Sequence, residues 1–513
     1  MAANSGDAGG AVSRRLFIAG SIGTAATLAA CSATTGQGST TSGASSISQA
    51  TDYEPTKAWF IPTAKRPPEN VLGAYASQGS VLSGEAIDLH VSTVEPNYRT
   101  EVFRIGDYDG KGGGRVGVQG PFPGKHHLPA KEDSRSKATA AYWPVSGQID
   151  TAGWEPGFYL VHVIAGKNKI DFPVMVRSEN ATGKVAYVST ATTWQAYNQW
   201  GGRSLYKGPD GNFDTRSFEV SLDRPFGLMG RNKYMGYDIP MVRVADGSDA
   251  DIAWFTNIDV ALDPSLLEGA AAVFTSGHDE YWPVPYRDAM TKARDAGSNI
   301  AIMGANTCYW RVRLKDSETG DGRRVVCYKS SELDPVKDAK DTTARWRDNP
   351  HADPENKLIG QMYDAFPTSG PMVIRDPGFW MFEGTGVRKG DKFDGLIGPE
   401  TDRIYPLEST PQPIQVAALS DTMCRGAKTW STMTYYTTDS GAGVLSTGTM
   451  AWVRALPRPG GLPGITDESM RFATHATQNA LHVFSKGPAA HDYPARNDFD
   501  NVKLPAHNTS GAA

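Results

Sequence analysis

Hydrophobic and polar residues alternate along the first third of the chain. Segments 86–91 and 100–105 alternate with a period of two, whereas 158–164 and 172–176 are nearly continuous apolar runs bounded by turn residues. A period of two is typical of strands that bury one face. Strands at this spacing predict an immunoglobulin-like β sandwich over residues 52–180.

The pattern changes near residue 184 to short, continuous apolar segments. Three of these, at 184–189, 271–276 and 299–304, have the length and composition of buried strands. Between the last two, residues 286–296 indicate a helix with Lys, Arg and Asp on its outward face. A strand, a helix and a strand at this spacing predict a right-handed βαβ unit in a parallel sheet.

Together the two patterns predict an α/β protein preceded by an all-β domain. We expect residues 181–490 to form a main domain with a parallel sheet of the amidotransferase or flavodoxin-like type. Within it, residues 310–440 are less regular, and 468–484 have the pattern of a closing helix. We expect residues 491–513 to form a flexible tail.

The first fifty residues have the pattern of an export signal. Arg14 and Arg15 precede a weakly apolar stretch that ends in Leu28-Ala29-Ala30-Cys31. Paired arginines before such a stretch are typical of the twin-arginine route. A cysteine in this setting resembles a lipidation site. We therefore predict a signal at 1–30, a tether rich in Ser, Thr and Gly at 31–51, and an extracytoplasmic protein anchored to the membrane through a lipid on Cys31.

Composition narrows the classes of partner. The 513 residues carry 51 Lys and Arg against 56 Asp and Glu, and 39% are hydrophobic. This composition is typical of a globular protein, and the absence of a basic stripe argues against a nucleic-acid partner. Besides Cys31, the cysteines are Cys308, Cys327 and Cys424, and a disulfide between Cys308 and Cys327 stays open.

Polar side chains follow each of the three apolar segments of the predicted parallel sheet. The clusters lie at 190–202, 277–282 and 304–311 and contain Tyr, His, Glu and Asn. Ligands of such sheets bind outside the carboxyl ends of the strands. We therefore expect the three clusters to meet in one site.

These clusters resemble the C-terminal region of the large subunit of N,N-dimethylformamidase and its relatives. The resemblance covers roughly residues 55–485, and it rests on segments 157–161, 196–198, 277–282 and 304–310. It implies a mononuclear Fe(III) held by two tyrosinates and one carboxylate. The implied metal ligands are Tyr159, Tyr197 and Glu280, with Tyr206 and Tyr281 as substitutes for Tyr159.

The resemblance also implies catalytic roles for His278, Asn306 and Glu400. Phenolate and carboxylate are hard anionic donors that suit ferric iron better than zinc or copper. His278, two residues before Glu280, could transfer a proton to a leaving amine. Asn306 could donate a hydrogen bond to the developing oxyanion, and Glu400 is the further acidic partner.

Each of these residues also has a purely structural interpretation, since a strand Tyr is most often a core residue and Asn306 could cap a turn. Two functions therefore stay open. The first is metal-dependent hydrolysis of the C–N bond of a small-molecule amide. The second is a non-catalytic envelope protein that binds a small ligand or a glycan, and metal content would distinguish the two. The sequence determines neither the substrate nor the oligomeric state.

Overall fold

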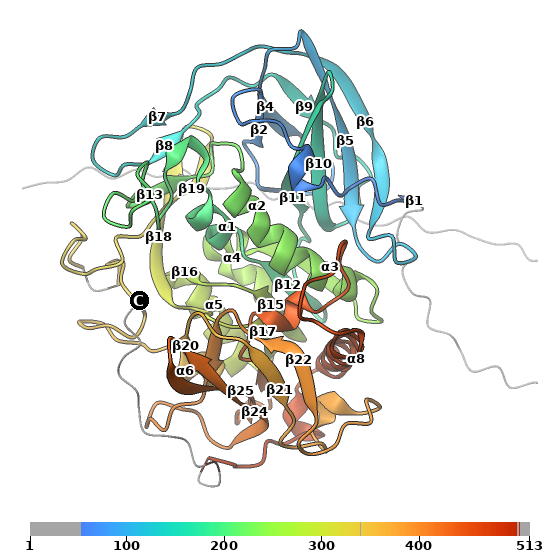
Figure 1. Ribbon diagram of the computed structural model, residues 1–513, viewed down its shortest axis with the longest axis vertical. Helices are drawn as coiled ribbons and strands as arrows, with labels where there is room; N and C mark the ends of the chain where they lie inside the picture. The colour runs from blue at the N-terminus through green and yellow to red at the C-terminus, as the bar shows by residue number, and fades with distance from the viewer. Residues whose placement is uncertain (1–52, 339, 500–501, 503–513) are drawn as a thin grey trace, which may run out of the picture. The chain divides into compact units, whose positions relative to one another are not determined.

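Residues 54–176 consist of strands and one short helix (Figure 1). The structure is a computed structural model that describes residues 53–338, 340–499 and 502. The elements of this region are β1 (Glu54–Pro55), η1 (Thr63–Lys65), β2 (Leu72–Ala76), β3 (Ser80–Val81), β4 (Ile87–Thr93), β5 (Asn97–Ile105), β6 (Gly113–Pro123), β7 (Lys131–Glu132), β8 (Thr139–Ala140), β9 (Gly147–Ile149), β10 (Gly157–Ala165) and β11 (Asn168–Val176). They form a sheet of order β1-β6-β5-β10-β11-β3, a sheet of order β2-β4-β9, and the pair β7-β8.

The two larger sheets of this region share one apolar core. Leu89 and Val91 of β4 pack there with Val161 of β10 and Val174 of β11. Burying such a side chain contributes roughly 1.5–3 kcal/mol relative to leaving it exposed. Every second residue of β4 and of β11 faces this core, and this period of two is that of a strand.

A seven-stranded mixed sheet is the largest sheet of the remaining chain. Its strands are β12 (Val185–Ser189), β14 (Ile252–Thr256), β15 (Ala272–Gly277), β17 (Asn299–Gly304), β24 (Ile414–Cys424), β25 (Ala427–Thr437) and β26 (Gly443–Ser446). Their order is β14-β12-β15-β17-β26-β25-β24. The first five strands are parallel, and β25 and β24 continue the sheet as an antiparallel hairpin.

Helices cover both faces of this sheet (Figure 1). Tyr187 of β12 points into a core shared with α3 (Ile239–Asp246) and α8 (Asp467–Phe484). Its neighbours Ala186 and Val188 point into the opposite core, with α4 (Asn257–Leu262), η4 (Pro264–Leu267) and α5 (Val284–Asp295). The other helices are α1 (Ala191–Tyr197), η2 (Trp200–Gly202), α2 (Leu228–Lys233), η3 (Tyr234–Asp238), α6 (Asn356–Ile359), η5 (Trp380–Phe382), α7 (Ala451–Arg454) and η6 (Ala489–His491).

Three smaller sheets come from segments inserted between the strands of the large one. A four-stranded sheet has the order β13-β19-β18-β16, and the pairs β20-β23 and β21-β22 complete the set. Their strands are β13 (Glu219–Ser221), β16 (Tyr281–Pro283), β18 (Trp310–Ser317), β19 (Gly320–Val326), β20 (Met362–Ala365), β21 (Gly370–Val373), β22 (Lys392–Ile397) and β23 (Thr401–Arg403).

The predicted fold class is wrong. Strands account for 34% of the chain and helices for 19%, in several small antiparallel and mixed sheets, and not in a parallel flavodoxin-like or amidotransferase-like arrangement. The strands β15 and β17 are parallel across α5, as expected, but the sheet continues from its five parallel strands into the antiparallel strands β25 and β24. The long antiparallel strands β24 and β25, with 11 residues each, lie in the stretch that we expected to be irregular. Because both faces of β24 are largely buried near its start, its sequence lacks the period-two signal of a half-exposed strand.

The carboxylate of Asp171 in β11 ties the strand region to helix α2. It accepts hydrogen bonds from Arg231 at 2.7 and 2.6 Å and from Arg66 at 2.6 Å. Burial alone would raise the pKa of Asp171, but the charges and hydrogen bonds of the two arginines outweigh it and lower the pKa to about 2. The ion pair between Asp171 and Arg231 therefore holds helix α2 against β11. This helix begins the helical segment that carries Lys233 and Tyr237.

Several further predictions concern the ends of the chain and the cysteines. The signal, the tether and Cys31 fall outside the described residues. Cys308 and Cys327 are both buried free thiols. In the predicted tail, Oδ2 of Asp498 forms an ion pair with Nη1 of Arg375 at 2.8 Å. Within the part of the chain that the structure describes, no helix has the length and apolar character needed to cross a membrane.

Candidate functional site

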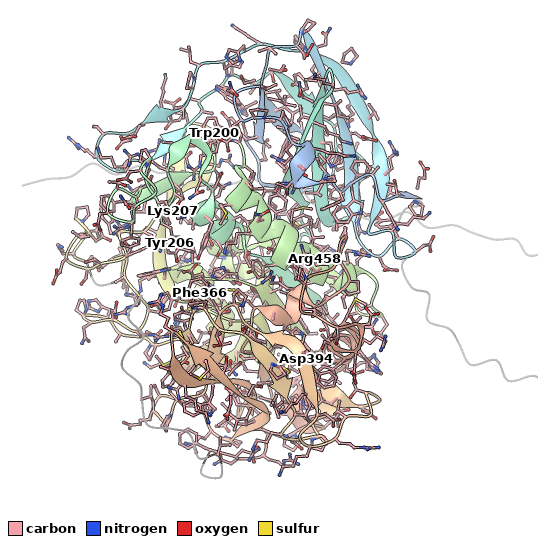
Figure 2. All side chains as sticks on the ribbon, viewed as in Figure 1. Trp200, Tyr206, Lys207, Phe366, Asp394 and Arg458 are labelled. Carbon is pink, nitrogen blue, oxygen red and sulfur yellow. The ribbon has the colours of Figure 1, made fainter. Side chains whose placement is uncertain are left out.

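The carboxylate of Glu280 lies at the centre of a cluster of polar side chains. The Tyr197 hydroxyl donates a hydrogen bond to its Oε2 at 2.8 Å, and the Tyr206 hydroxyl donates to its Oε1 (Figure 2 labels Tyr206). The indole Nε1 of Trp310 donates to Oε1 at 3.0 Å. The side chain of Glu280 is only 1% exposed. Two phenols thus converge on the two oxygens of one buried carboxylate.

The order of the large sheet explains why these residues meet. Tyr197 ends helix α1, which follows β12, while Glu280 and Asn306 follow β15 and β17. The three strands are adjacent and parallel, so the segments after them leave the same edge of the sheet. Tyr206 comes from the loop between η2 and β13, and its ring centroid lies 4.6 Å from that of Tyr197.

The imidazole of His278 has both ring nitrogens engaged. Its Nε2 lies 3.1 Å from Oε2 of Glu280, and its Nδ1 lies 2.9 Å from Nζ of Lys233. Burial and the Lys233 charge lower the pKa of His278 to about 4. The imidazole is therefore neutral near pH 7, and it donates through Nε2 to Glu280 and accepts through Nδ1 from Lys233.

Two lysines pack against the faces of the two tyrosines. Nζ of Lys233 lies 3.5 Å from the ring centroid of Tyr197, and Nζ of Lys329 lies 3.7 Å from that of Tyr206. The Lys329 ammonium also donates to the Tyr281 hydroxyl. Burial lowers the pKa of both lysines to about 8. Such contacts between a cation and a ring are worth roughly 0.5–2 kcal/mol.

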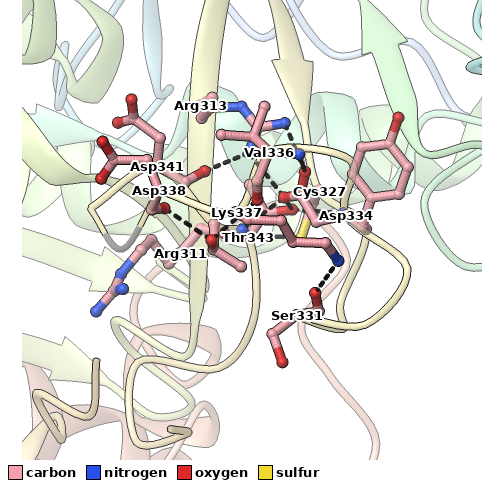
Figure 3. Close-up of polar contacts among 12 residues, drawn as sticks. Arg311, Arg313, Cys327, Ser331, Asp334, Val336, Lys337, Asp338, Asp341 and Thr343 are labelled. Carbon is pink, nitrogen blue, oxygen red and sulfur yellow. Dashed lines mark hydrogen bonds and ion pairs between the residues drawn. The ribbon is translucent and has the colours of Figure 1, made fainter. Parts of the chain in front are cut away.

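The loop that begins with Lys329 is held by the carboxylate of Asp334 (Figure 3). Asp334 accepts hydrogen bonds from Arg313 of β18 at 2.7 and 3.0 Å. It also accepts from the backbone N–H and the hydroxyl of Thr343, both at 2.7 Å. These bonds hold Asp334 and Thr343 against β18, the strand that begins with Trp310.

Asn306 and Glu400 form the other side of the cluster. The Nδ2 of Asn306 donates to Oε2 of Glu400 at 2.6 Å, and its backbone N–H donates to Asp402 at 2.7 Å. Oε2 of Glu400 lies 3.8 Å from Nε2 of His278. Burial and the charge of Glu280 raise the pKa of Glu400 to about 8. The sequence suggested that Asn306 donates a hydrogen bond to an oxyanion. In the structure its Nδ2 already donates to Glu400, so this amide group is not free for that role.

Three residues of this region have a strained backbone. Asn306, Cys308 and Lys329 have φ values of 53°, 56° and 61°, in the left-handed region that non-glycine residues rarely adopt. Each such residue costs of order 1 kcal/mol and persists only where the surrounding structure enforces it. Gly277, with φ of 65°, has no room for a Cβ, which would lie 2.3 Å from Cβ of Tyr237.

The phenols of Tyr197 and Tyr206 are held in their neutral form. Burial and the charge of Glu280 raise the pKa of both hydroxyls well above 10. By contrast, although burial opposes it, the hydrogen bonds from His278 and Tyr206 and the charge of Lys329 lower the pKa of Glu280 below its usual value. Together, Tyr197, Tyr206 and Glu280 thus carry one negative charge, on Glu280, and two exchangeable phenolic protons.

The structure brings Tyr197, His278, Glu280, Asn306 and Glu400 together. Tyr159 lies elsewhere, in the core between the two sheets of residues 54–176, where its hydroxyl donates to the Glu155 carbonyl at 2.6 Å. Of its two substitutes, Tyr206 contacts Glu280 directly and Tyr281 contacts Lys329.

Sequence reasoning missed the two lysines of the cluster. Lys233 lies on a helix with no recognised motif, and Lys329 follows β19 at the start of a charged stretch. The one available signal was the position of Lys329 three residues after the end of β19. Among the described residues, no group of three or more His, Cys, Asp or Glu side chains is placed to hold a metal, so any metal here would depend on the tyrosine oxygens.

Comparisons with known proteins give one informative match. A search of curated proteins finds no match. Among solved structures, a β-glucuronidase from Faecalibacterium prausnitzii is 13% identical with a TM-score of 0.15, over 46% of this chain and 28% of that one. A candidate lipoprotein from Bacillus anthracis is 12% identical with a TM-score of 0.11, over 24% of this chain and 84% of that one. The family model for N,N-dimethylformamidase beta subunit-like proteins, C-terminal region, matches residues 99–467. These residues include every member of the polar cluster around Glu280, and the chain belongs to the N,N-dimethylformamidase beta subunit-like family.

Proposed function

We propose that this protein hydrolyses the C–N bond of an amide with the help of a ferric ion held by Tyr197, Tyr206 and Glu280. The observation that carries the proposal is the convergence of two tyrosine hydroxyls on the two oxygens of one buried carboxylate. Membership in the N,N-dimethylformamidase beta subunit-like family supports the reaction class.

The residues present fit such an ion. The three side chains offer hard oxygen donors, which favour Fe(III) over softer metals. Release of the two phenolic protons would give the set three negative charges, enough to balance a trivalent cation. A buried polar atom without a hydrogen-bond partner among the described residues, Oδ1 of Asn306, lies on a side chain next to His278. When bound, the ion would act as a Lewis acid that polarises the amide carbonyl.

Glu400 is the residue that we assign to proton transfer. Its Oε2 is occupied by Asn306, whereas its Oε1 receives no hydrogen bond from a described residue. With 12% of its side chain exposed, Glu400 is more accessible than Glu280. In its ionised form, which prevails above its pKa of about 8, Glu400 takes a proton on Oε1 from the attacking water and then returns it to the leaving nitrogen, as general base and general acid in turn.

Asn306 and His278 position the reacting groups. The Oδ1 of Asn306 accepts the N–H of the substrate amide or of the departing amine, since its Nδ2 is already engaged. His278 connects the Lys233 ammonium to Glu280 and so orients the carboxylate from outside the donor set. The neutral imidazole holds its proton on Nε2.

We further propose that the chain is exported by the twin-arginine route and held at the cell envelope by a lipid on Cys31. The support is the paired Arg14 and Arg15 and the sequence around Cys31. Replacement of both arginines by Lys is expected to stop export, and Cys31→Ala to release the protein from membranes. Unchanged membrane attachment of Cys31→Ala would contradict the lipid anchor.

Elemental analysis of protein purified without chelators tests the central proposal. We expect about one iron per chain and a visible absorption band from tyrosinate-to-iron charge transfer. Release of amine from a panel of small amides measures the reaction in the same preparation. A folded, colourless and iron-free protein that iron neither binds nor activates would favour the alternative, a non-catalytic envelope protein that binds a small ligand or a glycan.

A further inference from the structure

Two arginines near the proposed active site have no acidic partner. Arg454 ends helix α7, and Arg458 follows it by four residues (Figure 2 labels Arg458). Both side chains are partly buried. Within the described part of the chain, neither guanidinium forms an ion pair or a hydrogen bond, and Nε of Arg458 is a buried donor without a partner.

The segment η3 connects these arginines to the polar cluster around Glu280. The Arg454 guanidinium lies 5.9 Å from the ring centroid of Tyr237, and that ring lies 6.0 Å from the imidazole of His278. A Cβ on Gly236 would lie 3.8 Å from Nη1 of Arg458. The charges of Glu400, Arg454 and Arg458 all act on the pKa of the Tyr237 hydroxyl. The two arginines and Glu400 therefore lie near Tyr237.

Other buried arginines among the described residues have hydrogen-bond partners: Arg224 and Arg243 donate to backbone carbonyls, and several more bind carboxylates. Arg231 binds Asp171, Arg347 binds Glu355 and Arg403 binds Asp364. By contrast, burial and the neighbouring Arg454 charge lower the pKa of Arg458. Two adjacent cations without a counter-charge destabilise the free protein, and an anion bound between them would relieve this cost.

We propose that Arg454 and Arg458 bind a carboxylate of the substrate, so that the substrate class is an N-acylated amino acid or a similar small amide with a carboxylate near the scissile bond. This inference rests on the proposed amide hydrolysis. Guanidinium groups match carboxylates with two parallel hydrogen bonds, and charge-assisted bonds of this kind are stronger than neutral ones. In the reaction, water adds its oxygen to the acyl carbon, the C–N bond breaks, and the nitrogen gains a proton. The products are a carboxylic acid and an amino acid.

Calorimetric binding of two matched compounds tests the arginine pair. N-acetylglycine carries the carboxylate, and N-acetylglycinamide is its neutral counterpart. We expect the purified protein to bind the acid about tenfold more tightly or better, as charge-assisted hydrogen bonds predict. Arg454→Gln with Arg458→Gln should remove this preference, and Lys at both positions should restore part of it. Arg471→Gln, which removes an exposed charge from α8, is the control and should keep the preference.

Amine release from both compounds separates this inference from the proposed function. Equal affinity for the two compounds, or a preference retained in the double Gln variant, would overturn the arginine assignment. Amine release from both compounds at equal kcat/KM would overturn it as well, while the proposed hydrolysis would stand. A carboxylate preference without any amine release would instead overturn the hydrolysis, and with it the assignment of the substrate class.

Discussion

The Nζ atom of Lys233 lies 2.9 Å from Nδ1 of His278, so a helix that follows the strand region contacts the residue that orients Glu280. This contact holds the imidazole in the tautomer that donates through Nε2 to Glu280. Lys233 thereby acts through His278, as a positioning residue.

Lys233→Met should keep iron and lose turnover. Without its donor, the imidazole can rotate or change tautomer, and loss of such an outer partner typically costs 10–100-fold. We expect a fall of roughly that size in kcat/KM and a shifted charge-transfer band. Lys207→Met removes an exposed lysine and is the matched control. A variant with unchanged kcat/KM and an unchanged spectrum would leave Lys233 with a packing role only.

Variants that each lack one tyrosine hydroxyl distinguish the proposed ligands Tyr197 and Tyr206 from Tyr159. The sequence predicted Tyr159 as a ligand, but it lies outside the cluster around Glu280. Tyr197→Phe and Tyr206→Phe each delete an oxygen that contacts Glu280, so iron content and the charge-transfer band should fall in both. Tyr159→Phe deletes a hydroxyl that donates to the Glu155 carbonyl and should keep both signals. Loss of iron in Tyr159→Phe with full iron in Tyr206→Phe would reverse the assignment.

Glu400→Gln should bind iron normally and hydrolyse amides poorly. The amide keeps the size of the carboxyl and its contact with Asn306 but cannot take a proton. General acid–base catalysis contributes roughly 10²–10⁴-fold, and we expect kcat to fall by about that factor. The measurement is single-turnover amine release together with elemental analysis. A Gln variant with wild-type kcat would exclude Glu400 from proton transfer.

The pair of Asp171 and Arg231 should make the fold sensitive to acid. The pKa of Asp171 is about 2 in the folded protein, against an ordinary value of 3.8 for an aspartate in an unfolded chain. Because the folded value is lower, the stabilisation is complete above about pH 4 and is lost as the pH falls towards 2. From this difference we expect about 2 kcal/mol of unfolding free energy to be lost across that window.

Asp171→Asn should abolish that part of the acid sensitivity and destabilise the protein at pH 7. The variant leaves Arg231 buried without its carboxylate, which costs roughly 3–5 kcal/mol. Asp439→Asn, at an exposed turn, is the control. Urea unfolding at pH 7 and pH 3 measures both effects. Equal losses of stability between these pH values in wild type and Asp171→Asn would contradict the prediction.

The residues that sequence reasoning located are those that directly follow strands. His278 and Glu280 come immediately after β15, and Asn306 comes after β17, so local order along the chain is enough to place them at one sheet edge. Lys233 and Lys329 approach from segments whose position depends on packing between distant parts of the chain. Nothing local in the sequence reports such packing.

Tyr159 shows how a correct strand can still give a wrong site. Successive side chains of a strand point to opposite faces. Phe158 and Leu160 face the core that contains Trp194 of α1, but Tyr159 faces the core between the two sheets. The fold class was wrong for a related reason. One βαβ unit was extended to the whole domain, whereas the hairpin β24–β25 and the small sheets are antiparallel or mixed.

The buried thiols Cys308 and Cys327 bear on how this protein matures. Burial raises their pKa to about 12 and about 11, so neither is a thiolate near neutral pH and both resist oxidation. The described core consequently needs no oxidant to reach its native packing. Such a chain can finish folding in a reducing cytosol, before the proposed passage through a membrane.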